Sequence, residues 1–141
     1  MTWYYKGREV DELPEDCVGY VYIITNLIDG RQYIGKKLSR FSKTSTKTIT
    51  LKDGSKKKKK IKSKAESDWK TYYGSSEHLN ADVAKYGEKC FKREIIHYCP
   101  NKGTLNYLEL REQIDRRVME SDNFYNGFVG TKVHKKHIKL S

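Results

Sequence analysis

Two short tyrosine-containing runs near the amino terminus hold side chains that are suited to chemistry. They are Gly19-Tyr20-Val21-Tyr22-Ile23-Ile24-Thr25-Asn26 and Tyr33-Ile34-Gly35-Lys36-Lys37. Val, Ile or Thr would serve a plain strand here, so closely spaced tyrosines indicate that hydroxyl groups are needed at a sheet surface. A phenol with a pKa of about 10 is a poor base. The ammonium of Lys36 is close enough in sequence to favour the phenolate of Tyr33.

The two runs predict a β-hairpin over residues 19–37. Asp29-Gly30 lies between them and is a turn signal that joins two apolar, β-branched and aromatic segments. Because side chains alternate along a strand, one face of the first strand receives Tyr20, Tyr22 and Ile24, and the other receives Val21, Ile23 and Thr25.

The rest of the chain supplies two helices and one more strand. Ser75 or Ser76 can cap a helix through about Tyr86, and residues 91–98 are typical of a strand. Thr104 can cap a long helix that ends near Glu120, with an apolar stripe of Leu110, Ile114 and Val118. We therefore expect an α+β domain over 19–130 with a small, mainly antiparallel sheet, after a lead-in (1–18) and before a basic tail (131–141).

The charge of the chain indicates a polyanionic partner. It has 141 residues, with 29 Lys+Arg against 18 Asp+Glu and a net charge of +11. No stretch is apolar and long enough to cross a bilayer, the start lacks a secretory segment, and the three cysteines form no CxxC pair. We expect a cytoplasmic protein that is neither secreted nor in a membrane.

Residues 38–68 are predicted to form a basic segment inserted after the hairpin. They contain few large apolar side chains and could be either a solvated, mobile segment or an arm that contacts phosphates, with one small hairpin around residues 48–55. We favour phosphate contact. The lysines expected to bind nucleic acid are Lys37, Lys43, Lys56, Lys57, Lys58, Lys59, Lys60, Lys62, Lys64 and Lys70.

The hairpin resembles the signature of the GIY-YIG nuclease family, in which a Gly-Ile-Tyr strand precedes a Tyr-Ile-Gly strand. Tyr20-Val21-Tyr22 and Tyr33-Ile34-Gly35 stand for the two triplets, and Asn26 ends the first strand as in the family. Tyr20 departs from the family's first glycine. Residues 69–76 are most similar to freestanding phage endonucleases of the homing type, the Seg-like group. The resemblance implies a central three-stranded sheet flanked by helices.

The same resemblance implies catalytic roles. Tyr22 and Tyr33 would face the scissile phosphate, and Glu109, on the helix after the third strand, would bind Mg²⁺, or Mn²⁺ in its place. Glu112 is the rival carboxylate. Asn126 would close the site by hydrogen bonds.

Two further roles are less closely matched. The family's phosphate-contacting arginine would be Arg40, or Lys43 in its place. The family's His or Tyr before the middle helix falls at Gly74, so Tyr73 or Tyr72 would substitute. His78 is interpreted as a surface histidine.

These residues together predict a Mg²⁺-dependent DNA endonuclease, most similar to phage homing-type enzymes, with no other cofactor. Hydrolysis of a phosphodiester needs an activated water, neutralised phosphoryl oxygens and help for the leaving oxygen. The alternatives are a non-catalytic DNA-binding protein with the same fold, a basic RNA-binding module, and a restriction-type or repair nuclease. The sequence does not indicate an oligomeric state.

Overall fold

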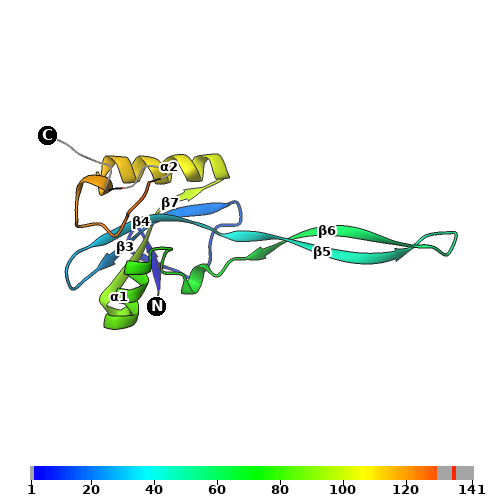
Figure 1. Cartoon of the computed structure of the whole chain (residues 1–141), viewed down its shortest axis with the longest axis horizontal. Coiled ribbons are helices and arrows are strands. Elements are labelled where there is room, and N and C mark those ends of the chain that lie inside the picture. Colours follow the sequence, from blue (N-terminus) through cyan, green and yellow to red (C-terminus); the bar gives the residue numbers. More distant parts are fainter. Residues whose placement is uncertain (1, 130–134, 136–141) are drawn as a thin grey trace.

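Six strands precede the first helical segment, and two of them leave the main body of the molecule (Figure 1). The computed structural model describes residues 2–129 and 135, with the backbone alone for residues 41–47 and 59–64. Its elements are β1 (Trp3–Tyr5), β2 (Arg8–Val10), β3 (Gly19–Asn26), β4 (Gln32–Leu38), β5 (Arg40–Thr50), β6 (Lys56–Glu66), η1 (Trp69–Thr71), α1 (Glu77–Tyr86), η2 (Glu88–Cys90), β7 (Phe91–Cys99), α2 (Lys102–Asp115) and η3 (Val118–Glu120).

The main sheet has five strands in the order β2-β1-β7-β3-β4, so the prediction of three strands was too small. The predicted hairpin is confirmed as β3 and β4, and β7 pairs antiparallel with β3 on its other side. The residues expected to form a lead-in contribute two further strands to the sheet: β1, which pairs parallel with β7, and β2, which pairs antiparallel with β1. Trp3 explains this addition, because its ring is 1% exposed and its Nε1 donates a hydrogen bond to the Trp69 carbonyl oxygen (2.6 Å).

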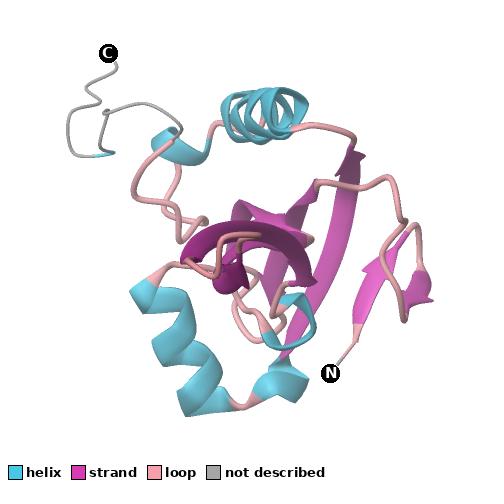
Figure 2. Cartoon of the chain, turned by 90° about the vertical axis from the view of Figure 1, so that its right-hand side faces the viewer, coloured by secondary structure: helices cyan, strands magenta, loops and turns pink. Residues whose placement is uncertain are grey.

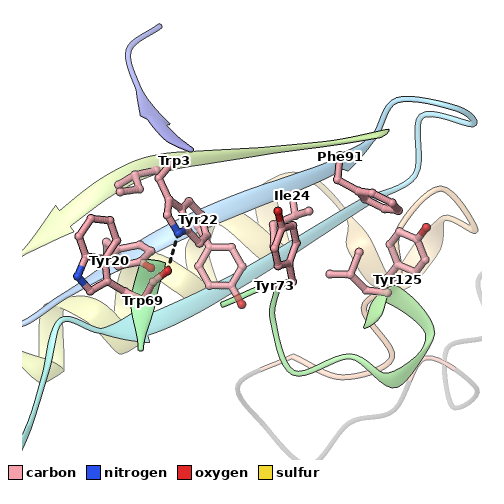
Figure 3. Close-up of a cluster of buried hydrophobic side chains, with 10 residues drawn as sticks. Trp3, Tyr20, Tyr22, Ile24, Trp69, Tyr73, Phe91 and Tyr125 are labelled. Atoms are coloured by element: carbon pink, nitrogen blue, oxygen red, sulfur yellow. Dashed lines mark hydrogen bonds between the residues drawn. The ribbon is translucent and has the colours of Figure 1, made fainter. Parts of the chain in front are cut away.

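One helix covers each face of this sheet (Figure 2). The α1 face is largely aromatic and buries Tyr20, Tyr22 and Ile24 of β3 with Trp3 and Trp69 (Figure 3). The α2 face is aliphatic and buries Val21 and Ile23 with Leu105 of α2. The two faces expected from the alternation along β3 are therefore confirmed.

The helix α1 begins and ends as the sequence predicts, whereas α2 does not. Ser76 caps α1, since its Oγ accepts a hydrogen bond from Leu79 N (3.3 Å). Asn101, and not Thr104, caps α2 through a hydrogen bond from Thr104 N to its Oδ1 (2.7 Å). The helix ends at Asp115 because Arg117 adopts a left-handed conformation (φ 54°).

The apolar stripe predicted for α2, Leu110, Ile114 and Val118, is not its buried face. Ile114 is 56% exposed, and Val118 is buried from η3 after the helix has ended. Leu105 and Gln113 are the residues that α2 buries most deeply. No helix within the described ranges has the length and apolar character needed to span a membrane. The predicted tail at 131–141 lies outside the described residues, apart from Lys135.

The basic segment forms a long two-stranded antiparallel ribbon, β5–β6. The small hairpin expected around residues 48–55 is present as the tip of this ribbon, where Leu51 N donates a hydrogen bond to the Ser55 carbonyl oxygen (2.7 Å). The ribbon extends away from the main sheet along the longest axis of the molecule (Figure 1). Only Ser39 separates β4 from β5, and only Ser67 and Asp68 separate β6 from η1. Ser39 and Ser67 are both buried, and Ser67 N donates to the Ser39 carbonyl oxygen (2.9 Å), so the base of the ribbon is joined to the core.

Candidate functional site

A cleft of about 660 Å³ lies beside the outer edge of β4. The strand β4 is the last in the sheet, so residues from both faces can reach this cleft around its edge. Tyr33 and Ser75 line it from the α1 side, Glu109 and Gln113 from α2, and Asn126 from the segment after η3. Three of the predicted site residues, Tyr33, Glu109 and Asn126, are therefore brought to one cavity from distant parts of the chain.

Glu109 is the acidic group of this cleft that the sequence singled out. Its side chain is 13% exposed, and its Oε1 lies 3.9 Å from Lys36 Nζ. Lys36 also donates a hydrogen bond to Asn106 Oδ1, one turn earlier on α2. Burial raises the pKa of Glu109 above its ordinary value, and the nearby Lys36 ammonium opposes that rise. The carboxylate is thus poorly solvated and only loosely paired, a state that favours binding of a further cation.

Glu112, the rival carboxylate, is already engaged elsewhere. Its Oε1 lies 2.7 Å from His97 Nε2, and its Oε2 accepts a hydrogen bond from Arg116 Nε (3.1 Å). Burial would raise its pKa, but the hydrogen bonds from His97 and Arg116 outweigh burial and lower it. Since Glu112 does not line the cleft, the geometry favours Glu109 between the two.

The two signature tyrosines lie on the same face of the hairpin, with ring centroids 6.1 Å apart. Their rings close over Gly35, which pairs with Tyr22 in the ladder. A Cβ atom at Gly35 would lie 2.5 Å from Tyr22 Oη and 2.8 Å from Tyr33 Cε1, so only glycine fits at this position. Tyr33 reaches the cleft, where its hydroxyl lies 2.9 Å from Ser75 Oγ. Tyr22 is fully buried and is not among the residues that line the cleft.

The surroundings of both tyrosines favour the protonated phenol. Burial raises the pKa of Tyr22, and the neighbouring phenols Tyr33 and Tyr72 raise it further. Burial also raises the pKa of Tyr33, with smaller contributions from Tyr72 and Glu109, although its hydrogen bond to Ser75 opposes the rise. The expected help from Lys36 is not seen, because its ammonium is directed to Asn106 and Glu109.

Asn126 holds the exposed edge of β4. Its Oδ1 accepts a hydrogen bond from Ile34 N (3.0 Å), and its Nδ2 donates one to the Ile34 carbonyl oxygen (2.8 Å). Gln113 Nε2 donates to the same carbonyl (3.1 Å). These side chains replace a neighbouring strand, and they fix Ile34 between Tyr33 and Gly35. The expected role of Asn126 in closing the site thus has a physical basis in the way it positions β4.

Like Tyr22 and Lys36, the predicted catalytic residues Arg40 and Tyr73 do not line this cleft. Arg40 begins β5, and its Nη1 donates a hydrogen bond to the Glu15 carbonyl oxygen (2.8 Å). Tyr73 is buried in the aromatic core (Figure 3). Its ring centroid lies 4.4 Å from the Arg93 guanidinium. Tyr72, the alternative to Tyr73, has its ring beside Tyr22, with centroids 5.9 Å apart.

The predicted DNA-binding lysines fall into three groups. Lys37 and Lys70 lie on the main body, where Lys37 Nζ is 2.5 Å from Asp68 Oδ1 and Lys70 is exposed. Lys56, Lys57 and Lys58 are exposed on β6. The side chains of Lys43, Lys59, Lys60, Lys62 and Lys64 lie outside the described residues.

Sequence reasoning missed Ser75, Asn106 and Gln113 as members of the site. Ser75 was considered only as a helix cap, although the cap is Ser76. Asn106 and Gln113 carried a usable signal, because each lies three or four positions from Glu109 and so shares its face of α2. Gln113 Oε1 is buried without a hydrogen-bond partner among the described residues, so it is available to a group bound in the cleft.

The donor set fits one hard cation held by few protein ligands. Among the described residues, no three His, Cys, Asp or Glu side chains converge as a metal cage. Mg²⁺ usually keeps several waters and needs only one or two carboxylates. The poorly solvated carboxylate of Glu109, in a cleft with room for water, meets that requirement.

Comparisons with known proteins agree with this geometry. The family model described as "Putative endonuclease segE, GIY-YIG domain" matches residues 3–129, a range that includes both tyrosine strands, Glu109 and Asn126. The "Putative endonuclease segE" of Enterobacteria phage T4 is 30% identical over 107 residues, which are 76% of this chain. The chain spans only 39% of that relative's length. No solved structure matches the chain.

Proposed function

The chain belongs to the GIY-YIG endonuclease family, and from that premise we propose that it is a Mg²⁺-dependent endonuclease that hydrolyses phosphodiester bonds of DNA. The single observation that supports this proposal best is the convergence of Glu109, Tyr33 and Asn126 on one cleft at the edge of β4. A protein that kept the fold only to bind DNA would have no need of a desolvated carboxylate beside a phenol. The convergence therefore favours a nuclease over a non-catalytic binding protein.

Five residues in or beside the cleft have proposed roles, and Ser75 supports one of them. Glu109 holds Mg²⁺, which when bound supplies positive charge to the phosphoryl oxygens. Tyr33 stays protonated and donates a hydrogen bond to the phosphate or to the attacking water, oriented by Ser75. Lys36 sets the position of Glu109 and adds positive charge at the site. Asn126 and Gln113 act as positioning residues, because they hold β4 at Ile34.

Cleavage of supercoiled plasmid tests this proposal. We expect nicking or linearisation by the wild-type protein with Mg²⁺ and none with EDTA. Glu109→Gln should abolish cleavage, whereas Glu112→Gln, one turn away on the same helix but outside the cleft, should retain most of it. Mn²⁺ should replace Mg²⁺, since both prefer oxygen ligands.

Two results would overturn parts of the proposal. Binding without cleavage in any divalent metal would identify a non-catalytic DNA-binding protein. Equal cleavage by wild type and Glu109→Gln would keep the nuclease and remove Glu109 as the metal ligand. Circular dichroism of both variants would show that they are folded.

We also propose a homing-type role in the cytoplasm of the cell that makes the protein, supported by the similarity to a phage protein. Digestion of a long phage-sized DNA distinguishes the alternatives that share this chemistry. A few discrete fragments would support a homing-type enzyme. Frequent cuts at a short repeated motif would instead indicate a restriction-type enzyme, and cuts confined to damaged or branched DNA would indicate a repair nuclease.

A further inference from the structure

The net charge of the protein is concentrated in the β5–β6 ribbon. Residues 40–66 contain ten lysines and one arginine against Asp53 and Glu66, so they hold nine of the eleven net positive charges. The main body, which contains the cleft, is close to neutral. Attraction to a polyanion must therefore come chiefly from the ribbon.

The two faces of the ribbon differ in composition. Cross-strand Cα partners occupy register positions on the same face of an antiparallel pair. Beyond Arg40–Glu66 at the base of the ribbon, every pair on one face joins a hydroxyl residue of β5 to a lysine of β6; we call this part the hydroxyl–lysine face. Its pairs are Ser42–Lys64, Thr44–Lys62, Thr46–Lys60, Thr48–Lys58 and Thr50–Lys56. The other face is mixed, and its pairs are Phe41–Ala65, Lys43–Ser63, Ser45–Ile61, Lys47–Lys59 and Ile49–Lys57.

The hydroxyl–lysine face has the groups that duplex DNA accepts. Ammonium groups neutralise phosphates, and hydroxyls donate to phosphates or to base edges. Thr48, Thr50, Lys56 and Lys58 are exposed, and on the mixed face Lys57 is exposed and Ile49 is half-buried. A lysine run that served only as a solvated tether would not need lysines of one strand to be paired with Ser and Thr of the other.

The dimensions of the ribbon match one turn of the duplex. Each strand has 11 residues, which span about 36 Å at about 3.3 Å per residue. One turn of B-DNA is about 34–36 Å long, and its major groove admits a two-stranded β-ribbon. The ribbon also continues from β4, the strand that carries Tyr33 and Lys36, so DNA held by it is directed toward the cleft.

From these observations we infer that the β5–β6 ribbon lies in the major groove of duplex DNA, over about one turn on one side of the cleft, with its hydroxyl–lysine face toward the bases. This inference rests on the proposed function only in taking DNA as the nucleic acid. It separates the basic residues of the ribbon into lysines that enter the groove and lysines that do not.

Two charge-matched variants test the face preference. Lys58→Gln/Lys60→Gln/Lys62→Gln removes three charges from the hydroxyl–lysine face, and Lys47→Gln/Lys57→Gln/Lys59→Gln removes three from the mixed face. Both are made in the Glu109→Gln chain, and binding to a duplex of about three helical turns is measured over a salt series. The first variant should lose at least about tenfold in affinity and reduce the salt slope by about three. The second should lose about threefold or less.

Chemical probing of guanine N7, which lies in the major groove, tests whether the ribbon occupies that groove. The Glu109→Gln chain should protect N7 over about one turn, and the hydroxyl–lysine face variant should lose that protection. Equal affinity losses for the two variants, or unprotected N7 positions, would overturn the inference. Equally tight binding to duplex RNA of the same sequence would also overturn it, because the A-form major groove is too narrow for the ribbon.

Failure of this inference is distinguishable from failure of the proposed function. The binding measurements use a protein that lacks Glu109, so they do not depend on cleavage. If the wild-type chain fails to cut plasmid while the face preference holds, the proposed nuclease is wrong and the ribbon inference stands. If the variants bind equally while the wild type cuts, only the ribbon inference fails.

Discussion

The core of the main body and the β5–β6 ribbon use charged residues in opposite ways. In the core, Arg93 is a buried charged residue with specific partners, and it is 1% exposed. Its Nη1 donates hydrogen bonds to the carbonyl oxygens of Lys70 (3.0 Å) and Tyr72 (2.9 Å). Its guanidinium lies 4.7 Å from the centroid of the Trp3 ring. In the ribbon the charges are repeated along one strand, and those whose side chains are described are exposed. Catalysis requires a few groups at fixed distances, whereas attraction to a polyanion requires many charges in the same region.

This contrast predicts that binding and cleavage can be changed separately. Substitutions in the ribbon should weaken affinity and leave the rate at saturating DNA nearly unchanged. Substitutions in the cleft should lower that rate and leave affinity nearly unchanged. A substitution that changed both equally would show that the two regions do not have separate roles.

Removal of the ribbon should have the largest effect. Residues 42–64 can be replaced by Asn-Gly between the paired residues Phe41 and Ala65, a turn that suits a two-residue hairpin. We expect affinity for duplex DNA to fall by about a thousandfold or more at 0.1 M salt, because nearly all phosphate-neutralising charge is lost. Fluorescence anisotropy measures the affinity. Unchanged binding would assign DNA capture to the core.

Tyr33→Phe should have the next largest effect, and it should change the cleavage rate and not the affinity for DNA. Loss of the hydroxyl beside Ser75 should lower the single-turnover cleavage rate at saturating DNA by about a hundredfold, with affinity unchanged. Tyr20→Phe is the matched control, because the buried Tyr20 hydroxyl has no partner among the described residues. Its cleavage rate should equal that of the wild type, and its Tm should be equal or higher. Equal loss of rate in the two variants would remove Tyr33 from the mechanism.

Gly35→Ala should destabilise the core by about 1–3 kcal/mol, because its methyl group would overlap both signature tyrosines. Gly103→Ala, in the first turn of α2, is a control in which the nearest atom is 3.5 Å from the new Cβ. It should be neutral or stabilise by up to about 1 kcal/mol. Urea denaturation measures both changes. A neutral Gly35→Ala would mean that the two rings do not close over this position in solution.

The smallest effects concern two carboxylates on α2. Folding raises the pKa of Glu109, so its ionised form destabilises the folded state at neutral pH. Glu109→Gln should therefore raise Tm slightly at pH 7, and the difference should disappear as the pH falls through the raised pKa. Folding lowers the pKa of Glu112, so Glu112→Gln should lower Tm at pH 7. That stabilisation by Glu112 is lost as the pH falls through its lowered pKa. Thermal unfolding of metal-free protein from pH 7 to well below 4.5, the ordinary pKa of a Glu carboxyl, tests the opposite signs.

The sequence predicted those elements whose patterns are local. The hairpin, α1 and β7 followed from alternation, a serine cap and β-branched residues. The β1–β2 pair was missed because its strands are only three residues long, although Trp3-Tyr4-Tyr5 before Lys6-Gly7 is a strand-and-turn pattern. The end of α2 was missed because Arg117, and not a glycine, takes the left-handed conformation.

The ribbon and the cleft could not be predicted in the same way. A run of lysines has low strand propensity, so the pairing of β5 with β6 was not visible in the composition. The cleft depends on the position of β4 at the sheet edge, and edge position is a property of the topology. The sequence could nominate Glu109 and Tyr33, but it could not show that Arg40 and Tyr73 lie elsewhere.

The fit of Gly35 beneath the two tyrosine rings also bears on how the hairpin folds. A strand can pair with its neighbour in slipped registers, and a slip of one residue exchanges its two faces. Any slip of β4 by one position would bring Ile34 or Lys36 opposite Tyr22, where there is no room for a side chain. Misregistered hairpins would therefore fail to close the aromatic core. Gly35 in this way selects a single pairing of β3 with β4, because only that register leaves room for both rings.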